Sequence, residues 1–259
     1  MAKTLRELLD EALAEPIPES VVPPTINEHL QHVPVILLID SSGSMEGAKI
    51  EAVNARLTEF FEEIASGAGS AARTIREQGD FAVIRYGSDV KAVVPWTHGS
   101  QLKGLPPFHA VGGTPMGAAI LMAGQMLLDR LGAYSRDDAE VLCGAVFNLT
   151  DGAPTDMDPS GIGTDNQFHS EIQKMWREAK EVIAFFEEAG TRGKSYIQFF
   201  HLGVPGFDVD KMQLLSAKPD RVYSIDSNIS EFFDFVKLSL SGLGDFQTIA
   251  DAIQARLKT

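Results

Sequence analysis

Apolar positions along this chain follow two periods that alternate. Short apolar runs, rich in β-branched residues, predict buried strands near residues 35–39, 81–86, 91–96, 141–150, 196–204 and 221–225. Between them, apolar residues recur every three or four positions and predict amphipathic helices near residues 50–64, 118–128, 171–188, 210–216 and 231–240. Alternating strands and helices predict an α/β fold, a three-layer, doubly wound (Rossmann-like) and mostly parallel sheet.

The second and third predicted strands flank Gly87-Ser-Asp89 and therefore predict a hairpin. Pro95 and the shortness of the third strand indicate an edge position in the sheet, because proline cannot donate to a ladder. Trp96 is interpreted as a packing anchor.

The two ends of the chain differ from its centre. Residues 4–14 predict a helix with a capping box formed by Thr4 and Glu7, followed by a proline-rich linker. Its apolar stripe favours packing on the host domain over docking to another chain. We therefore divide the chain into an N-terminal helix and linker at 1–32, a domain at 33–240 and a C-terminal helical extension at 241–259.

A polar loop follows the first strand and carries candidate chemistry. Asp40, Ser42 and Ser44 offer only hard oxygen atoms, and their alternating spacing lets a tight loop aim three side chains at one point. Hard oxygens suit Mg²⁺, Mn²⁺ or Ca²⁺, whereas zinc and copper prefer nitrogen or sulfur. Such ions take about six ligands, so other segments must contribute.

Two later segments have the required composition. Thr114 follows Gly112-Gly113 at the start of a predicted helix, where it also fits a helix N-cap, with Pro115 at the first helical position. Asp151 ends another apolar strand and precedes Gly152. Carboxyl ends of parallel strands form the ligand-binding edge of such sheets.

Together these segments resemble the metal-ion-dependent adhesion site of von Willebrand factor type A domains. The resemblance covers roughly residues 33–240 and is closest to the intracellular bacterial branch associated with tellurium resistance. It implies that one edge strand is antiparallel. It also implies that Ser42, Ser44 and Thr114 bind a divalent cation directly, while Asp40 and Asp151 bind it partly through water. One coordination position is then left for a partner's Asp or Glu.

Composition limits the classes of partner that the chain can bind. The net charge of −14 and pI near 4.8 repel nucleic acid and anionic membranes, so we expect neither as a partner. Cys143 is the single cysteine, which excludes an intramolecular disulfide. No apolar run approaches the length of a membrane span, and Lys3 and Arg6 interrupt any signal-like core. We therefore expect a cytoplasmic protein.

Other polar residues carry weaker signals. The loop over 156–167 partly fits a calcium-loop template, but Gln167 stands where a bidentate Glu is required; a polar recognition loop or a solvated insertion is the main alternative. We interpret His29 and His32 as surface residues, His109 as a rim residue and His201 as a core histidine.

The sequence therefore predicts a non-enzymatic protein-binding module that holds Mg²⁺, with Mn²⁺ or Ca²⁺ as alternatives, and has no catalytic residues. The resemblance implies partners in a bacterial stress or signalling complex, including kinase or phosphatase chains. One alternative is a magnesium-dependent phosphoryl-transfer or hydrolase enzyme, although an aspartyl-phosphate hydrolase would need an acid where Ser42 stands. Another is a structural subunit that acts through its N-terminal helix.

Overall fold

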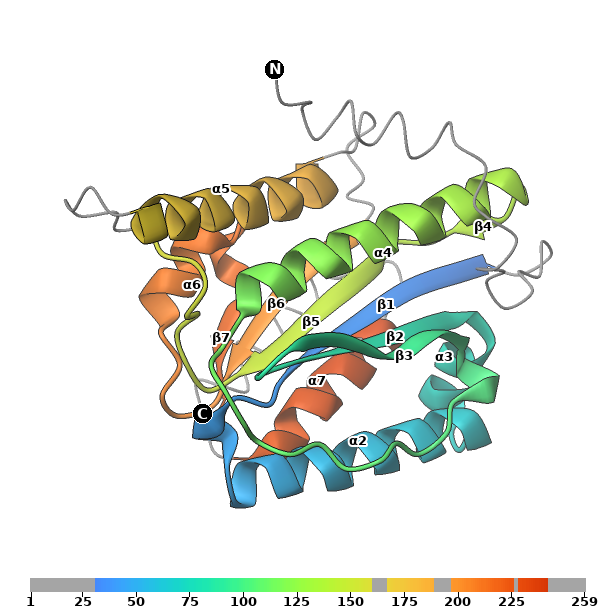
Figure 1. The fold of residues 1–259 in the computed structure, drawn as a ribbon. Helices are drawn as coiled ribbons and strands as arrows, with labels where there is room; N and C mark the ends of the chain where they lie inside the picture. Colours follow the sequence, from blue (N-terminus) through green and yellow to red (C-terminus); the bar gives the residue numbers. More distant parts are fainter. Residues whose placement is uncertain (1–30, 160–166, 189–196, 226–227, 242–259) are drawn as a thin grey trace.

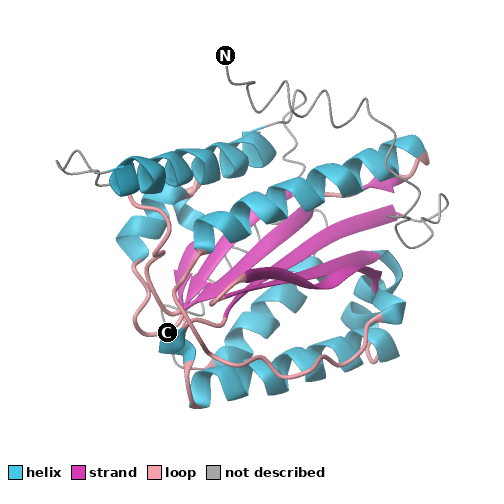
Figure 2. Ribbon diagram, viewed as in Figure 1, coloured by secondary structure: helices cyan, strands magenta, loops and turns pink. Residues whose placement is uncertain are grey.

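A computed structural model describes residues 31–159, 167–188, 197–225 and 228–241 of the chain. In this part a seven-stranded sheet lies between two layers of helices (Figures 1 and 2). The strands are β1 Gln31–Asp40, β2 Gly79–Tyr86, β3 Val90–His98, β4 Glu140–Val141, β5 Gly144–Thr150, β6 Ile197–Gly203 and β7 Val222–Ser224. The α-helices are α2 Ala48–Ser66, α3 Ser70–Gln78, α4 Met116–Arg136, α5 Gln167–Glu188, α6 Val209–Leu215 and α7 Ile229–Ser241. The helices predicted near residues 4–14 and 246–257 lie outside the described residues.

The strand order confirms the predicted fold class. The sheet runs β3-β2-β1-β5-β6-β7, and the short β4 pairs with the start of β1. β2 and β3 pair in antiparallel orientation, whereas every other described pair is parallel. The hairpin therefore lies at the sheet edge, as predicted, and the Trp96 indole N–H anchors it by donating to the Met126 carbonyl on α4, 3.2 Å away.

Alternation along the central strand divides the core into two layers. Val35, Leu37 and Ile39 of β1 pack in one layer, with α2, α3 and α7. Ile36 and Leu38 pack in the other, with α4, α5 and α6. Because side chains of a strand point alternately to its two faces, an unbroken apolar run is what a strand covered on both sides requires.

Two local features differ from the predicted elements. The strand predicted over 141–150 is interrupted at Leu142 and Cys143, which separate β4 from β5. Helix α3 was not predicted, because only Ala72 and Ile75 of its nine residues are buried and no apolar stripe is legible. Helix α2 ends, close to its predicted end at residue 64, where Gly67 takes a left-handed conformation (φ +67°).

The prediction that His32 is a surface residue is wrong. His32 is buried, and its Nδ1 lies 2.8 Å from Asp80 Oδ2 at the start of β2. The same carboxylate oxygen accepts from the Tyr134 hydroxyl and forms an ion pair with Arg130 at 2.9 Å. Burial raises the pKa of Asp80, but His32, Arg130 and Tyr134 outweigh it and bring this pKa down to about 2. This charged cluster lies at the end of the sheet opposite to the candidate site.

Candidate metal site

The topology brings the predicted site residues to one edge of the sheet. β1 and β5 are parallel neighbours in a register that pairs Ile39 with Leu149, so that Asp40 and Asp151 follow adjacent strand ends. Asp40 is fully buried and Asp151 is 3% exposed. The two aspartates are more than 100 residues apart in the sequence, and the pairing of β1 with β5 alone makes them neighbours in space.

Backbone hydrogen bonds hold the loop after β1 against the loop that precedes α4. The N–H of Gly43 donates to the Gly112 carbonyl at 3.0 Å, and the N–H of Val111 donates to the Ser41 carbonyl at 2.8 Å. Gly112 takes a φ of +86°, and a Cβ there would lie 2.5 Å from the Cα of Ser88. Only glycine fits this position, which explains the first glycine of the pair before Thr114.

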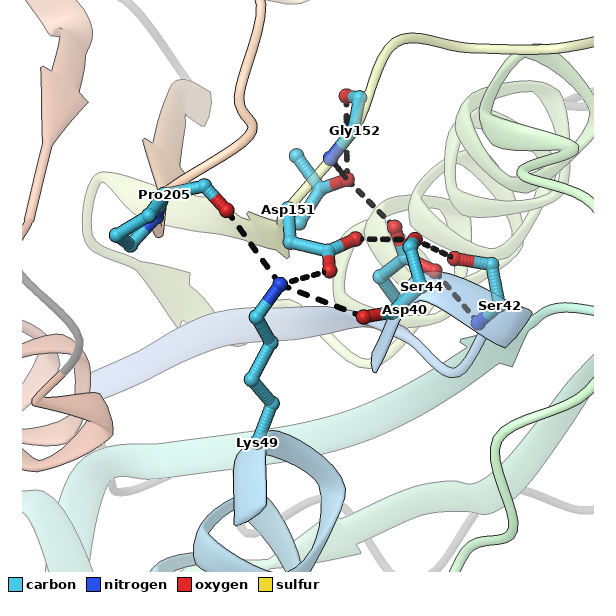
Figure 3. Close-up of polar contacts among 8 residues, drawn as sticks. Asp40, Ser42, Ser44, Lys49, Asp151, Gly152 and Pro205 are labelled. Carbon is cyan, nitrogen blue, oxygen red and sulfur yellow. Dashed lines mark hydrogen bonds and ion pairs between the residues drawn. The ribbon is translucent and has the colours of Figure 1, made fainter. Parts of the chain in front are cut away.

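Side-chain oxygens from the loop after β1 and from the end of β5 meet at this edge (Figure 3). The Ser42 and Ser44 hydroxyl oxygens are 3.1 Å apart, and the Ser44 hydroxyl donates to Asp151 Oδ1 at 2.6 Å. Asp40 accepts from the Ser42 N–H at 2.8 Å and from the Thr150 hydroxyl at 2.5 Å. We call Asp40, Ser42, Ser44, Thr114 and Asp151 the oxygen cluster.

Thr114 joins this cluster through its position beside Gly152. A Cβ added at Gly152 would lie 3.9 Å from both the Ser44 and the Thr114 hydroxyl oxygens, so a single point next to Gly152 is close to both. Thr114 itself is 5% exposed, whereas Gly43, Ser44 and Gly113 are exposed. The outer side of the cluster therefore faces solvent.

The alternative interpretation of Thr114, as the cap of the following helix, does not hold. Helix α4 begins at Met116, with Pro115 at the cap position and no side-chain cap bond there. Instead Asp156 reaches the helix from the loop after β5, and its carboxylate accepts from the N–H groups of Gly117 (3.0 Å) and Ala118 (2.8 Å). A carboxylate suits the positive end of a helix dipole, so the Thr114 hydroxyl is left for other contacts.

The same finding bears on the calcium-loop template over 156–167. Asp156 would be its first ligand, yet both of its oxygens accept from helix N–H groups. Asp158, the third position, pairs with Lys211 at 2.7 Å. Residues 160–166 lie outside the described residues, so the remaining positions of the template are untested.

Burial has the largest effect on the pKa of Asp40 in the cluster. Burial raises the pKa of Asp40, the hydrogen bonds from Thr150 and Ser42 partly oppose this, and the nearby Asp151 carboxylate adds to the rise. Two carboxylates with little access to water repel each other, and a cation between them lowers that energy.

Two residues of this site were missed by the sequence analysis. Thr150 fixes Asp40, and its position directly before Asp151 was a signal. Lys49 lies in the first turn of α2, where the helix dipole disfavours cations, so a lysine there was a signal for a nearby acid. Its ammonium lies 2.5 Å from Asp151 Oδ2 (Figure 3).

The histidines do not contribute ligands to the oxygen cluster in the described structure. His109 is exposed and lines a surface pocket of about 470 Å³ between β3 and the 105–111 loop. His201 is fully buried in β6, as predicted for a core histidine, and its Nδ1 lies 3.2 Å from Asn148 Nδ2. Asn148 Oδ1 in turn accepts from the Tyr86 hydroxyl at 2.7 Å.

The donor set fits a hard divalent cation. Within the described residues no three His, Cys, Asp or Glu side chains gather into a metal site, so an ion here would depend on serine and threonine hydroxyls beside two carboxylates. These are oxygen donors of the kind that Mg²⁺, Mn²⁺ and Ca²⁺ accept. The close approach of the Lys49 ammonium shows that the cluster already attracts positive charge.

Comparison with known proteins supports the resemblance to von Willebrand factor type A domains in general. The sequence profile of the von Willebrand factor type A domain matches residues 35–152, which contain the whole oxygen cluster. The comparison with curated proteins finds no match. None of the helices in the described part combines the length and apolar composition that a membrane crossing requires.

Solved structures share the fold at low sequence identity. The pilus adhesin SpaC from Lactobacillus rhamnosus GG has a TM-score of 0.58 at 16% identity, covering 85% of this chain and 31% of the adhesin. The von Willebrand factor domain of the pilus tip protein Mfa5 from Porphyromonas gingivalis has a TM-score of 0.55 at 13% identity, covering 83% and 97%. A von Willebrand factor type A protein from Catenulispora acidiphila has a TM-score of 0.50 at 17% identity, covering 82% and 43%.

The chain thus spans about a third of the adhesin and under half of the Catenulispora protein, but nearly all of the Mfa5 domain. Its strand order and its antiparallel edge show the fold of von Willebrand factor type A domains, and the profile of that family matches residues 35–152.

Proposed function

We propose that this chain is a non-enzymatic protein-binding module whose oxygen cluster holds a divalent cation. Ser42, Ser44 and Thr114 would bind the ion through their hydroxyls, with Asp40 and Asp151 contributing charge directly or through water. Because three of the five donors are neutral, the ion keeps enough positive charge to attract an acidic side chain of a partner protein. Mg²⁺ is the expected ion, with Mn²⁺ and Ca²⁺ as alternatives.

One observation carries this proposal. The Ser44 hydroxyl is within hydrogen-bonding distance of both the Ser42 hydroxyl and the Asp151 carboxylate, and it and the Thr114 hydroxyl are equally near one point beside Gly152. The exposed Ser44 and Gly113 leave the outer side of the cluster accessible to a partner. An adhesin and a pilus tip protein share the fold, which supports a role in binding.

The biological setting belongs to the same proposal. The net charge of −14 and the single cysteine favour a cytoplasmic partner, in a bacterial stress or signalling complex that includes kinase or phosphatase chains. The fold alone also occurs in pilus proteins, so the location rests on composition.

Geometry argues against the enzyme alternative. A nucleophilic carboxylate needs a free oxygen that faces its substrate, but Asp40 is fully buried and both of its oxygens accept hydrogen bonds. Ser42 stands where an aspartyl-phosphate hydrolase needs a second acid. Turnover of phosphate esters with Mg²⁺ that is abolished by Asp40→Ala would refute the non-enzymatic proposal.

The metal claim is tested by removing one oxygen. Thr114→Val keeps the shape of the side chain and deletes only the hydroxyl, so we expect Mn²⁺ affinity, measured by isothermal titration calorimetry, to fall about tenfold. Thr58→Val on α2 is the matched control, because its hydroxyl bonds to the Asn54 carbonyl away from the cluster. Equal affinity in both variants and the wild type would contradict the proposed ligand set.

The binding claim is tested by partner capture. Immobilised protein is incubated with extract of the cells that express it, in Mg²⁺ or in chelator, and bound proteins are identified by mass spectrometry. We expect partners that require Mg²⁺ and are lost with Asp151→Ala, but retained with Asp129→Ala, an exposed acid on α4. Partners lost only on deletion of residues 1–24 would instead indicate a structural subunit that acts through its N-terminal segment.

A further inference from the structure

Lys49 already places a positive charge on the oxygen cluster. Its ammonium donates to Asp151 Oδ2 at 2.5 Å, to the Ser44 carbonyl at 3.3 Å and to the Pro205 carbonyl at 3.4 Å (Figure 3). The Asp151 side chain is fully buried, whereas the Lys49 side chain is 34% exposed. The other oxygen of Asp151 accepts from the Ser44 hydroxyl, so lysine and hydroxyl share one carboxylate.

A divalent cation and this ammonium compete for the same carboxylate. An ion bound to Ser44 and Asp151 would lie within a few ångströms of the Lys49 ammonium, and two positive charges about 4 Å apart repel even in water. An ammonium has only donors, so it cannot serve as a ligand. Lysine differs from a fixed counter-ion because its charge sits on a flexible four-carbon stem.

The route of displacement is open. Lys49 is the second residue of α2, at the solvent-facing start of the helix, and Ala48 and Glu46 beside it are exposed. Its two carbonyl contacts are long, so the ion pair with Asp151 is the main contact that draws the ammonium inward. An ion that takes over Asp151 removes that contact.

We propose that Lys49 is a tethered cation that neutralises Asp151 in the absence of metal and is displaced into solvent when a divalent ion binds. Lys49 thereby lowers metal affinity and sets the ion concentration at which a partner can bind. This inference rests on the proposed function, because it presupposes that the oxygen cluster binds a divalent cation.

The first test compares Mn²⁺ affinity in three full-length proteins at one pH and ionic strength. Lys49→Met keeps the length of the side chain and removes its charge. We expect this variant to bind Mn²⁺ at least about tenfold tighter than the wild type, because the ion no longer has to break the Lys49–Asp151 ion pair. Lys237→Met is the matched control: it makes the same change in net charge, and Lys237 pairs with Glu63 (2.8 Å) near the other end of α2. We expect the control to match the wild type.

The second test follows the lysine itself. Wild-type protein is treated with an acetylating reagent in Mn²⁺ or in chelator, and modification at Lys49 is measured by mass spectrometry relative to Lys237. We expect Mn²⁺ to increase the modification of Lys49 several-fold, because its ammonium leaves the carboxylate. A Lys49 that is equally or less reactive with bound Mn²⁺ contradicts displacement and indicates that lysine and metal bind side by side.

The outcomes separate this inference from the proposed function. If Lys49→Met binds Mn²⁺ equally well or more weakly than the wild type, the tethered-cation role is wrong and the metal site stands. If neither protein binds Mn²⁺, the proposed metal site is wrong and this inference falls with it.

Discussion

His201 gives the sharpest test of the buried structure beneath the site. Its ring is fully buried, and burial lowers its pKa to about 4 from an ordinary 6.5. Asn148 uses its carbonyl oxygen to accept from Tyr86, so its amide nitrogen must donate to His201 Nδ1. The ring is therefore held neutral, with Nδ1 as an acceptor, and protonation at Nδ1 would set two donors against each other.

The folded and unfolded chains bind a proton at His201 over different pH ranges, and this difference makes stability depend on pH. The unfolded chain binds a proton at His201 near pH 6.5, whereas the folded chain resists until about pH 4, so acid favours unfolding in this window. Linkage over these two pKa values predicts a loss of about 2 kcal/mol between about pH 7.5 and 5, rising to about 3 kcal/mol at about pH 4.

The assay is urea denaturation across this pH range for the wild type and for His201→Gln. Glutamine can accept from Asn148 and gains no charge in acid, so its free energy of unfolding should fall less than that of the wild type by the amounts above. His109→Gln is the control, because His109 is exposed and its loss should leave the pH dependence unchanged. Identical pH slopes for the wild type and His201→Gln would refute the reasoning.

Two further predictions concern stability. Asp80→Asn leaves the buried Arg130 guanidinium without a carboxylate and should lower the free energy of unfolding by about 3 to 5 kcal/mol. The double variant Asp80→Asn with Arg130→Met should restore part of this stability. An unchanged urea midpoint for the single variant would contradict the prediction. Asp156→Ala removes both acceptors at the start of α4 and should lower the free energy of unfolding by about 1 to 2 kcal/mol. Asp129→Ala, at an exposed position on the same helix, is the control and should lower it by less than about 0.5 kcal/mol in the same urea titrations.

The fold could be predicted because its signals are local and repeated. The unbroken apolar run of β1 requires a strand that is covered on both faces, and the three-to-four periodicity of α2 requires a helix that is covered on one face. Few topologies accommodate an alternation of such strands and helices. The hairpin at Gly87-Ser-Asp89 was equally local. Helix α3 was missed because nine residues with two buried positions carry too weak a pattern.

The cluster was predictable from motif order, but its surroundings were not. Asp40 and Asp151 each follow an apolar strand, so the sequence indicates that both lie at the same edge of a parallel sheet, and the structure shows that the two strands are neighbours. That Asp156, and not Thr114, caps α4 depends on how the loop after β5 folds back over the helix. His32 looked like a surface residue because its partner Asp80 is 48 residues away and has no sequence signature.

The most direct test of the metal site is the anomalous scattering of crystals soaked in Mn²⁺. We expect one strong peak at the edge of the sheet, bonded to the Ser42 and Ser44 hydroxyls and adjacent to Thr114 and Asp151, with a coordination position open toward solvent. A saturating soak that gives no peak at this cluster, or a peak whose coordination is completed by the chain itself, would contradict the claim that this site binds a partner through a metal ion.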